Sequence, residues 1–119
     1  MDSRRRGAGL ASRRMAKLIL IVTARTQPGR RDDVRALWDR HLRPRAEANQ
    51  AQELYLFCED ADDADAFHLV EVYTDPGAAQ ENARAPWFAD YMREVGPLLA
   101  GRPRMISARP VWAKGFELS

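Results

Sequence analysis

Residues 18–22 limit the folds open to this chain more than any other stretch, because all five are aliphatic. A strand with one wet face alternates apolar and polar residues, so an unbroken run predicts a strand buried on both faces. In a chain of 119 residues, one layer of helices covers only one side of a sheet. A second copy of the chain is the simplest cover for the other side, and we therefore expect a homodimer.

The remaining elements follow from periodicity and from prolines. Apolar positions spaced as on one helix face predict a helix from about Arg31 that kinks or ends before Pro44. The face consists of Val34, Leu37, Trp38, His41 and Leu42. Residues 53–58 and 66–74 predict two strands joined by a short acidic loop, which is an antiparallel hairpin.

Asp75-Pro76 starts a second helical region, which breaks at Pro86, resumes, and stops at Gly96-Pro97. A last strand is expected over residues 105–114, where Pro110 suits a sheet edge. The order β-α-β-β-α-β predicts an α+β protein with the ferredoxin-like split βαβ fold and an antiparallel sheet.

The charge of the chain is unevenly distributed. Residues 1–14 hold five arginines and one aspartate, which leaves 14 basic and 16 acidic residues in the rest. We expect residues 1–15 to be a disordered arginine-rich tail and residues 16–119 to form one domain. Arg13-Arg14 resembles a twin-arginine signal, but no small-residue cleavage site follows it, and Met15 is an alternative start.

Composition and motifs exclude several classes of partner. The body carries no basic excess for nucleic acid, and no apolar run reaches the roughly 20 residues of a membrane span. The single cysteine, Cys58, excludes an internal disulfide and suits a cytoplasmic protein. The acidic run 59–65 lacks EF-hand spacing, so we expect a solvated loop there. His41 and His68 have no partner at metal-ligand spacing, and nucleotide and flavin motifs are missing, so no metal or cofactor is expected.

Glu71 is the candidate functional residue that stands out. Strand alternation places it with Phe67, Leu69 and Tyr73 on an apolar, aromatic face, where a carboxylate costs free energy unless it is paired or neutralised. Either Glu71 accepts a proton in catalysis, or it is structural. The structural interpretation pairs it at a dimer interface with one of three arginines, which are Arg35, Arg84 and Arg109.

His68 is the second candidate base, although a structural histidine is the simpler interpretation. It has the opposite strand parity to Glu71, so both reach one cavity only if a bulge intervenes. Six aromatic residues converge between helices and sheet in a split βαβ domain, either as core or as the lining of a ligand cavity. They are Trp38, Tyr55, Tyr73, Trp87, Phe88 and Tyr91.

Three features together resemble the antibiotic biosynthesis monooxygenase family, which includes quinol monooxygenases. They are the Pro28-Gly29 turn before a charged helix, the strand ending Glu71-Val72-Tyr73-Thr74-Asp75, and the alanine-rich helix leading to Pro86-Trp87-Phe88. The resemblance covers most of residues 16–114. It implies a dimeric α+β barrel in which two sheets pack face to face, the cover that the first strand requires.

The chain also departs from that family. Members often have a histidine where this chain has Asn82 and another where it has Trp87. The haem-degrading branch has an iron-ligand histidine where Met92 stands and uses a first-strand asparagine that residues 18–25 lack. Methionine does not replace a neutral imidazole as the proximal ligand, so haem degradation is not expected.

The resemblance and the residues together lead to one hypothesis and one alternative. The hypothesis is a cofactor-independent monooxygenase that oxidises a small phenolic or quinol-type substrate with O2. Glu71 or His68 is the proton acceptor, Trp87 and Tyr73 orient the substrate, and the other aromatic residues form walls. The alternative is a dimeric module of the same fold that binds a small hydrophobic ligand, or serves only as a scaffold, without catalysis.

Overall fold

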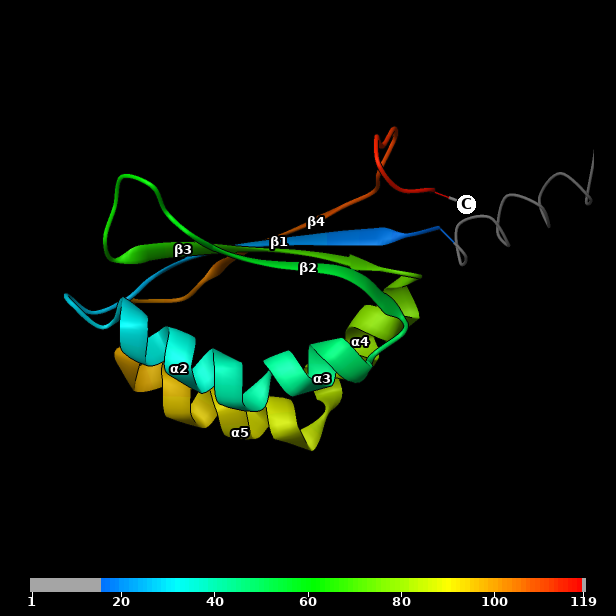
Figure 1. Cartoon of the computed structure of the whole chain (residues 1–119). Helices are drawn as coiled ribbons and strands as arrows, with labels where there is room; N and C mark the ends of the chain where they lie inside the picture. The colour runs from blue at the N-terminus through cyan, green and yellow to red at the C-terminus, as the bar shows by residue number, and fades with distance from the viewer. Residues whose placement is uncertain (1–15, 119) are drawn as a thin grey trace, which may run out of the picture.

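The structure, a computed structural model, describes residues 16–118, so the predicted tail over residues 1–15 lies outside the described part. Four strands form one antiparallel sheet in the order β2-β3-β1-β4, and the helices lie on one side of it (Figure 1). This confirms the α+β, ferredoxin-like prediction. The elements are β1 (Leu18–Arg25), α2 (Arg31–His41), α3 (Arg43–Ala48), β2 (Gln52–Glu59), β3 (Ala66–Tyr73), α4 (Pro76–Arg84), α5 (Pro86–Val95), the 3-10 helix η1 (Gly96–Leu98) and β4 (Arg104–Ala108).

The pairing of β1 with β3 decides which side chains face the helices. Leu20 lies opposite Glu71, and Val22 lies opposite Leu69. Because Val22 and Leu69 belong to the buried core that contains Val34 of α2, this set of positions points toward the helices. Glu71 shares their parity and therefore points into the interior between sheet and helices.

The alternate positions form the sheet surface away from the helices, which we call the open face. It carries the half-buried Ile19, Ile21, Leu54 and Val70 and the more exposed Leu56 and Ile106. Leu56 is 49% exposed and Ile106 is 42% exposed. The segment after β4 rises on this side of the sheet (Figure 1). The apolar first strand thus has helices on one face and an apolar surface on the other.

Prolines divide both helical regions, as the sequence predicts. α2 ends at His41, and α3 begins with Pro44 in its first turn. α4 ends at Arg84, Ala85 is extended, and α5 restarts at Pro86. Each proline occupies a position whose backbone N–H has no partner within its helix. Within residues 16–118, no helix is long and apolar enough to cross a membrane.

The predicted last strand over residues 105–114 is wrong in its second half. β4 ends at Ala108, which pairs with Ile19 near the start of β1. Pro110 has no N–H to donate to a ladder, and β1 offers only Leu18 beyond that point. Val111 and Trp112 are therefore not in a sheet, and they are 93% and 77% exposed.

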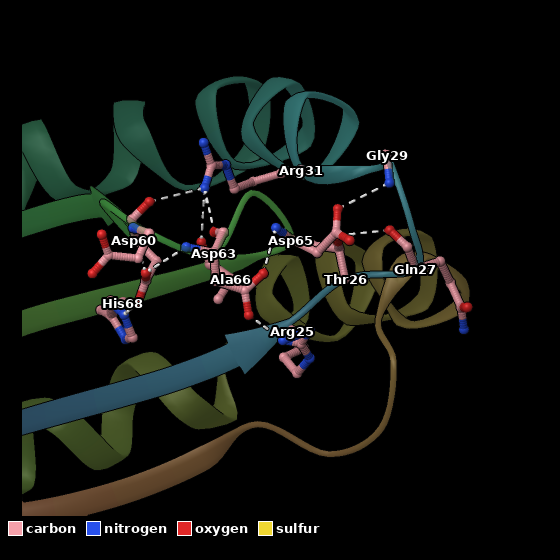
Figure 2. A network of polar contacts seen from close by, with 11 residues as sticks. Arg25, Thr26, Gln27, Gly29, Arg31, Asp60, Asp63, Asp65, Ala66 and His68 are labelled. Carbon is pink, nitrogen blue, oxygen red and sulfur yellow. Dashed lines mark hydrogen bonds and ion pairs between the residues drawn. The ribbon is translucent and has the colours of Figure 1, made fainter.

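The acidic loop between β2 and β3 is a structured turn and not simply a solvated loop (Figure 2). Arg31 Nη1 donates to the backbone carbonyls of Asp60, Asp63 and Ala66, at 3.3, 2.9 and 3.2 Å. Asp60 Oδ1 accepts from the backbone N–H groups of Asp62 and Asp63. The turn is thus stabilised by the first residue of α2 and by its own carboxylates.

A second set of contacts joins this turn to the Pro28-Gly29 turn. Asp65 Oδ1 accepts from the backbone N–H of Gly29 at 3.0 Å, and Asp63 pairs with Arg25 of β1. Gly29 has φ of 75°, a conformation that L side chains rarely adopt. The glycine of this turn is therefore required by the backbone.

We predict that Asp75→Ala lowers the free energy of unfolding by about 1 kcal/mol, because the Asp75 carboxylate caps α4 by accepting from Ala78 N–H at 3.0 Å. Urea unfolding monitored by circular dichroism measures this change. Asp90→Ala is the matched control. Among residues 16–118, Asp90 pairs with exposed Arg93, so its loss should change stability by less than about 0.5 kcal/mol. Equal effects of the two substitutions would contradict the assignment.

Candidate functional site

A β-bulge in β2 brings an amide side chain to Glu71. Leu54 lies opposite Val72, but Gln52 lies opposite Tyr73, so Glu53 is an extra residue between the two pairs. Without the bulge, Gln52 would share the parity of Leu54 and point to the open face. With it, Gln52 points toward the helices and is only 8% exposed.

Glu71 is held by two donors on the same oxygen. Its Oε1 accepts from Tyr73 Oη at 2.5 Å and from Gln52 Nε2 at 2.9 Å. Asn82 of α4 donates from Nδ2 to Tyr73 Oη at 3.2 Å, and Asn49 Nδ2 lies 3.4 Å from Asn82 Oδ1. A polar cluster of Gln52, Glu71, Tyr73, Asn82 and Asn49 therefore connects the sheet to α4.

Glu71 points into the interior of the domain. Glu71 is 7% exposed and lies on the helix side of the sheet, not on the open face. Its partners are Gln52 and Tyr73, whereas Arg35 approaches Glu59 at 3.9 Å. The predicted alternative of an arginine partner at a dimer interface is therefore wrong for this carboxylate, and the amide and the phenol take that place.

Burial raises the pKa of the Glu71 carboxyl above its ordinary value, although the hydrogen bonds from Tyr73 and Gln52 oppose the shift. The pKa of the Tyr73 hydroxyl is raised by burial and by the negative charge of Glu71. Burial, followed by the charge of Glu71, also raises the pKa of Tyr55. The phenols therefore stay protonated, and Glu71 is the group of this cluster that can take up a proton.

Two oxygens of the cluster are left without a donor among the described residues. Gln52 Nε2 donates to both Glu71 and Tyr73, which fixes the orientation of the amide and turns Oε1 away from the carboxylate. Gln52 Oε1 is buried and has no hydrogen-bond partner. Such an unpaired acceptor costs about 1–3 kcal/mol. Glu71 Oε2 likewise accepts no hydrogen bond from the described residues.

Two of the predicted aromatic residues, Trp38 and Tyr55, contact each other beside Glu71. Trp38 Nε1 donates to Tyr55 Oη at 2.9 Å, and the two ring centroids are 5.6 Å apart. Phe57 lies 4.9 Å from Trp38 and stacks on Phe67 at 5.3 Å. Tyr55 is directly opposite Glu71 in the β2–β3 ladder, so the carboxylate borders an aromatic layer.

The three aromatic residues of α5 form a second group. Phe88 lies 6.0 Å from Trp87 and 6.3 Å from Tyr91, measured between ring centroids. Tyr91 is 6% exposed, and burial raises its pKa to about 12. Its ring centroid is 6.0 Å from that of His41 on α2. This group lines the junction of α2 and α5.

His68 is not part of this cluster. It lies on the open face, where Nε2 is 2.7 Å from Asp60 Oδ2 and Nδ1 is 3.2 Å from Thr23 Oγ1. A carboxylate only accepts, so Nε2 carries the proton that it donates to Asp60. That bond, together with the backbone N–H groups of Asp63 and Asp62, lowers the pKa of Asp60 to about 2. The sequence correctly predicts the opposite parity of His68 and Glu71.

A groove with a volume of about 420 Å³ opens between the ends of α2, α3 and α5. It is lined by Arg40, His41, Pro44, Arg45, Ala48 and Trp87. Trp87 is thus the one predicted site residue that lines it. Arg45 stands over the Trp87 ring, with Cζ 5.4 Å from the ring centroid.

Sequence reasoning missed Gln52 as a site residue. Strand alternation counted from Leu54 assigns Gln52 to the wrong face, and no local signal marks the bulge. Arg45 was missed because only the tertiary arrangement brings it to Trp87. Asn82 was noted only as a departure from the resembled family, and its contact with Tyr73 gives it a structural place.

We predict that the stability of Glu71→Gln relative to the wild type rises with pH. Because the folded-state pKa of Glu71 is raised, its favourable contribution is complete below its unfolded pKa and is lost as pH rises through the folded pKa. The amide that replaces the carboxyl does not ionise, so the variant escapes that loss. Urea unfolding between about pH 4 and pH 8 measures the difference. Glu81→Gln, an exposed control on α4, should show no such trend, and a flat difference for Glu71→Gln would refute the ionisation argument.

No protein-family model matches the sequence, and no curated protein matches it. Solved structures do match. A protein from Chloroflexus aurantiacus, described as a "putative Antibiotic biosynthesis monooxygenase", is 24% identical, with a TM-score of 0.71 over 84% of this chain and 98% of that one. One from Caulobacter crescentus with the same description is 16% identical, with a TM-score of 0.77 over 88% and 99% of the two chains.

Rv0793 from Mycobacterium tuberculosis is 26% identical, with a TM-score of 0.73 over 82% of this chain and 98% of that one. These matches span nearly all of each neighbour, so they concern the whole fold and not a shared fragment. The strand order of this chain and its similarity to these neighbours both indicate the same fold. The chain therefore has the antibiotic biosynthesis monooxygenase-like fold that the resemblance in its sequence indicated.

Proposed function

We propose that this protein is a cofactor-independent monooxygenase that oxidises a small phenolic or quinol-type substrate with O2. The observation that carries the proposal is the buried Glu71 carboxylate, whose raised pKa and free Oε2 suit a proton acceptor. The structural neighbours described as antibiotic biosynthesis monooxygenases support the reaction class.

In this proposal the substrate supplies the electrons. Glu71 Oε2 removes the phenolic proton, and the resulting phenolate transfers one electron to O2. The phenoxyl radical and superoxide combine at a ring carbon, and the peroxide takes a proton. Loss of water leaves a quinone. One oxygen atom enters the product, and the other leaves as water, so a phenol and O2 give a quinone and H2O.

The neighbours of Glu71 have distinct parts in this proposal. Tyr73 and Gln52 bind Oε1 and leave Oε2 directed for the proton transfer. Tyr55 and Trp38 provide the aromatic wall, while Trp87, Phe88 and Tyr91 extend it along α5. Aromatic walls that exclude water leave the phenolate poorly hydrated, and this favours electron transfer from it to O2. His68, which lies on the open face, takes no part in this site.

One observation favours the alternative, a non-catalytic module that binds a small hydrophobic ligand. Two donors that could stabilise a substrate anion are already used within the chain, because Trp38 Nε1 donates to Tyr55 Oη and Tyr73 Oη donates to Glu71. On this view the polar cluster joins β3 to α4 and does no chemistry. Substrate turnover distinguishes the two.

We predict oxygen uptake above the spontaneous rate when metal-free and flavin-free protein meets a panel of quinols and anthrones. Glu71→Gln should lower the rate by roughly 10²–10⁴-fold, the usual contribution of a general base. Glu81→Gln should leave it unchanged, because Glu81 is exposed on α4. A clear result against the proposal is wild-type uptake no faster than the buffer, or full activity in folded Glu71→Gln; the non-catalytic module would then be favoured.

We also propose a homodimer in which two open faces pack against each other. The open face supplies exposed apolar side chains at Leu56 and Ile106 beside the half-buried Ile21. Burial of such a surface in a second copy removes it from water. It also gives β1 the second cover that its unbroken aliphatic run requires.

We expect Ile106→Lys to shift the protein from dimer to monomer in sedimentation velocity, because it places a charge in the packed face. Met105→Lys is the matched control. Met105 is the adjacent residue, is 60% exposed, and has the opposite parity in β4, where it pairs with Val22. A wild-type monomer at micromolar concentration, or equal dissociation by both substitutions, would rule out this interface.

A further inference from the structure

The groove between α2, α3 and α5 has the chemistry of an anion site with an aromatic side. Three of its six lining residues are Arg40, His41 and Arg45, a fourth is Trp87, and no acidic residue of the described part lines it. Its volume of about 420 Å³ falls within the roughly 300–1,000 Å³ of small-molecule sites. The groove is therefore large enough for a substituted aromatic ring.

Arg45 is the cation of this groove that has no carboxylate within ion-pair distance among the described residues. Nearby Arg43 pairs with Asp39 and Glu47, both at 3.0 Å. Glu94 pairs with Arg40 at 2.7 Å and also contacts His41. Arg45 contacts the face of Trp87 instead. A guanidinium placed over an indole presents its planar fork beside a stacking surface, which suits a carboxylate attached to a ring.

The groove is also connected to the Glu71 cluster by two short routes. The ring centroid of His41, a groove residue, is 6.0 Å from that of Tyr91, and Tyr55 packs against the core cluster that contains Tyr91. On α3, Ala48 of the groove precedes Asn49, which contacts Asn82 and through it Tyr73. The residues that line the groove are thus linked by packing and by hydrogen bonds to the elements that hold the proposed base.

We propose that this groove recognises the carboxylate of an aromatic acid, so that the substrates of the site are carboxylated phenols or quinols. Arg45 binds the carboxylate, and Trp87 stacks on the ring. This substrate class rests on the proposed function, but the binding of the acid does not depend on turnover.

The test compares 1-hydroxy-2-naphthoate with 1-naphthol, which lacks the carboxylate. Binding is measured under nitrogen by isothermal titration calorimetry, so that oxidation does not contribute. We expect the wild type to bind the acid about tenfold more tightly, the size of one charge-assisted contact. Arg45→Gln should abolish this preference and leave the affinity for 1-naphthol unchanged, and Arg45→Lys should restore only part of it.

Arg43→Gln is the matched control, because Arg43 lies two residues away on α3, is paired with Asp39 and Glu47, and does not line the groove. It should keep the preference for the acid. Circular dichroism of each variant verifies folding. The proposal is overturned by equal affinity for the two probes, by no detectable binding of the acid at about 1 mM, or by the same loss in Arg43→Gln.

Two further measurements distinguish this proposal from a general anion site and from the monooxygenase proposal. Inorganic phosphate that competes as well as the acid would identify a general anion site and overturn the aromatic assignment. Binding of the acid without oxygen uptake on any phenol would leave the groove assignment standing while the monooxygenase proposal fails. Equal rates of oxygen uptake with the carboxylated and the uncarboxylated phenol would overturn the groove assignment and leave the monooxygenase proposal standing.

Discussion

The register of β1 against β3 determines the side of the sheet on which every central side chain lies. Shifting it by one residue would exchange the two faces and move Glu71 to the open face. The aliphatic run in β1 does not fix this register, since it is apolar on both faces. β3 does fix it, because Glu71 is paired only on the helix side and His68 is paired only on the open side. The polar residues of β3 thus specify the arrangement of the apolar ones.

The buried carboxylate of Glu71 lies close to tyrosine hydroxyls, and burial affects the pKa of every one of these groups in the same direction. Burial raises the pKa of Tyr55, Tyr73 and Tyr91, so all three hydroxyl groups remain donors at neutral pH. Glu71, whose pKa burial raises, is then the neighbouring group that can take up a proton. The same burial that makes the charged form costly also makes Glu71 suited to receive a proton, so stability and the proposed chemistry draw on one desolvation effect.

Much of the fold could be predicted from sequence because its boundaries are set by local chemistry. Pro44 and Pro86 mark the helix breaks, Asp75 caps α4, and alternation gives Glu71 and His68 opposite faces. The sequence-based predictions fail where the structure of a segment depends on residues far away in the chain. β4 ends where its partner β1 runs out, and the acidic turn is ordered by Arg31 from another element. The groove is similarly out of reach of a local pattern, since it joins the ends of three helices.

The bulge at Glu53 shows how little separates an apolar interior from a polar one. Gln52 reaches Glu71 because one extra residue offsets the end of β2, while Leu54 and the rest of the strand keep their register. A lineage that lost this single residue would keep its sheet and would return Gln52 to the other surface, which would leave the carboxylate with Tyr73 alone. Changes in strand length, and not only substitutions, are thus a route by which chains of this architecture can acquire or discard a polar centre.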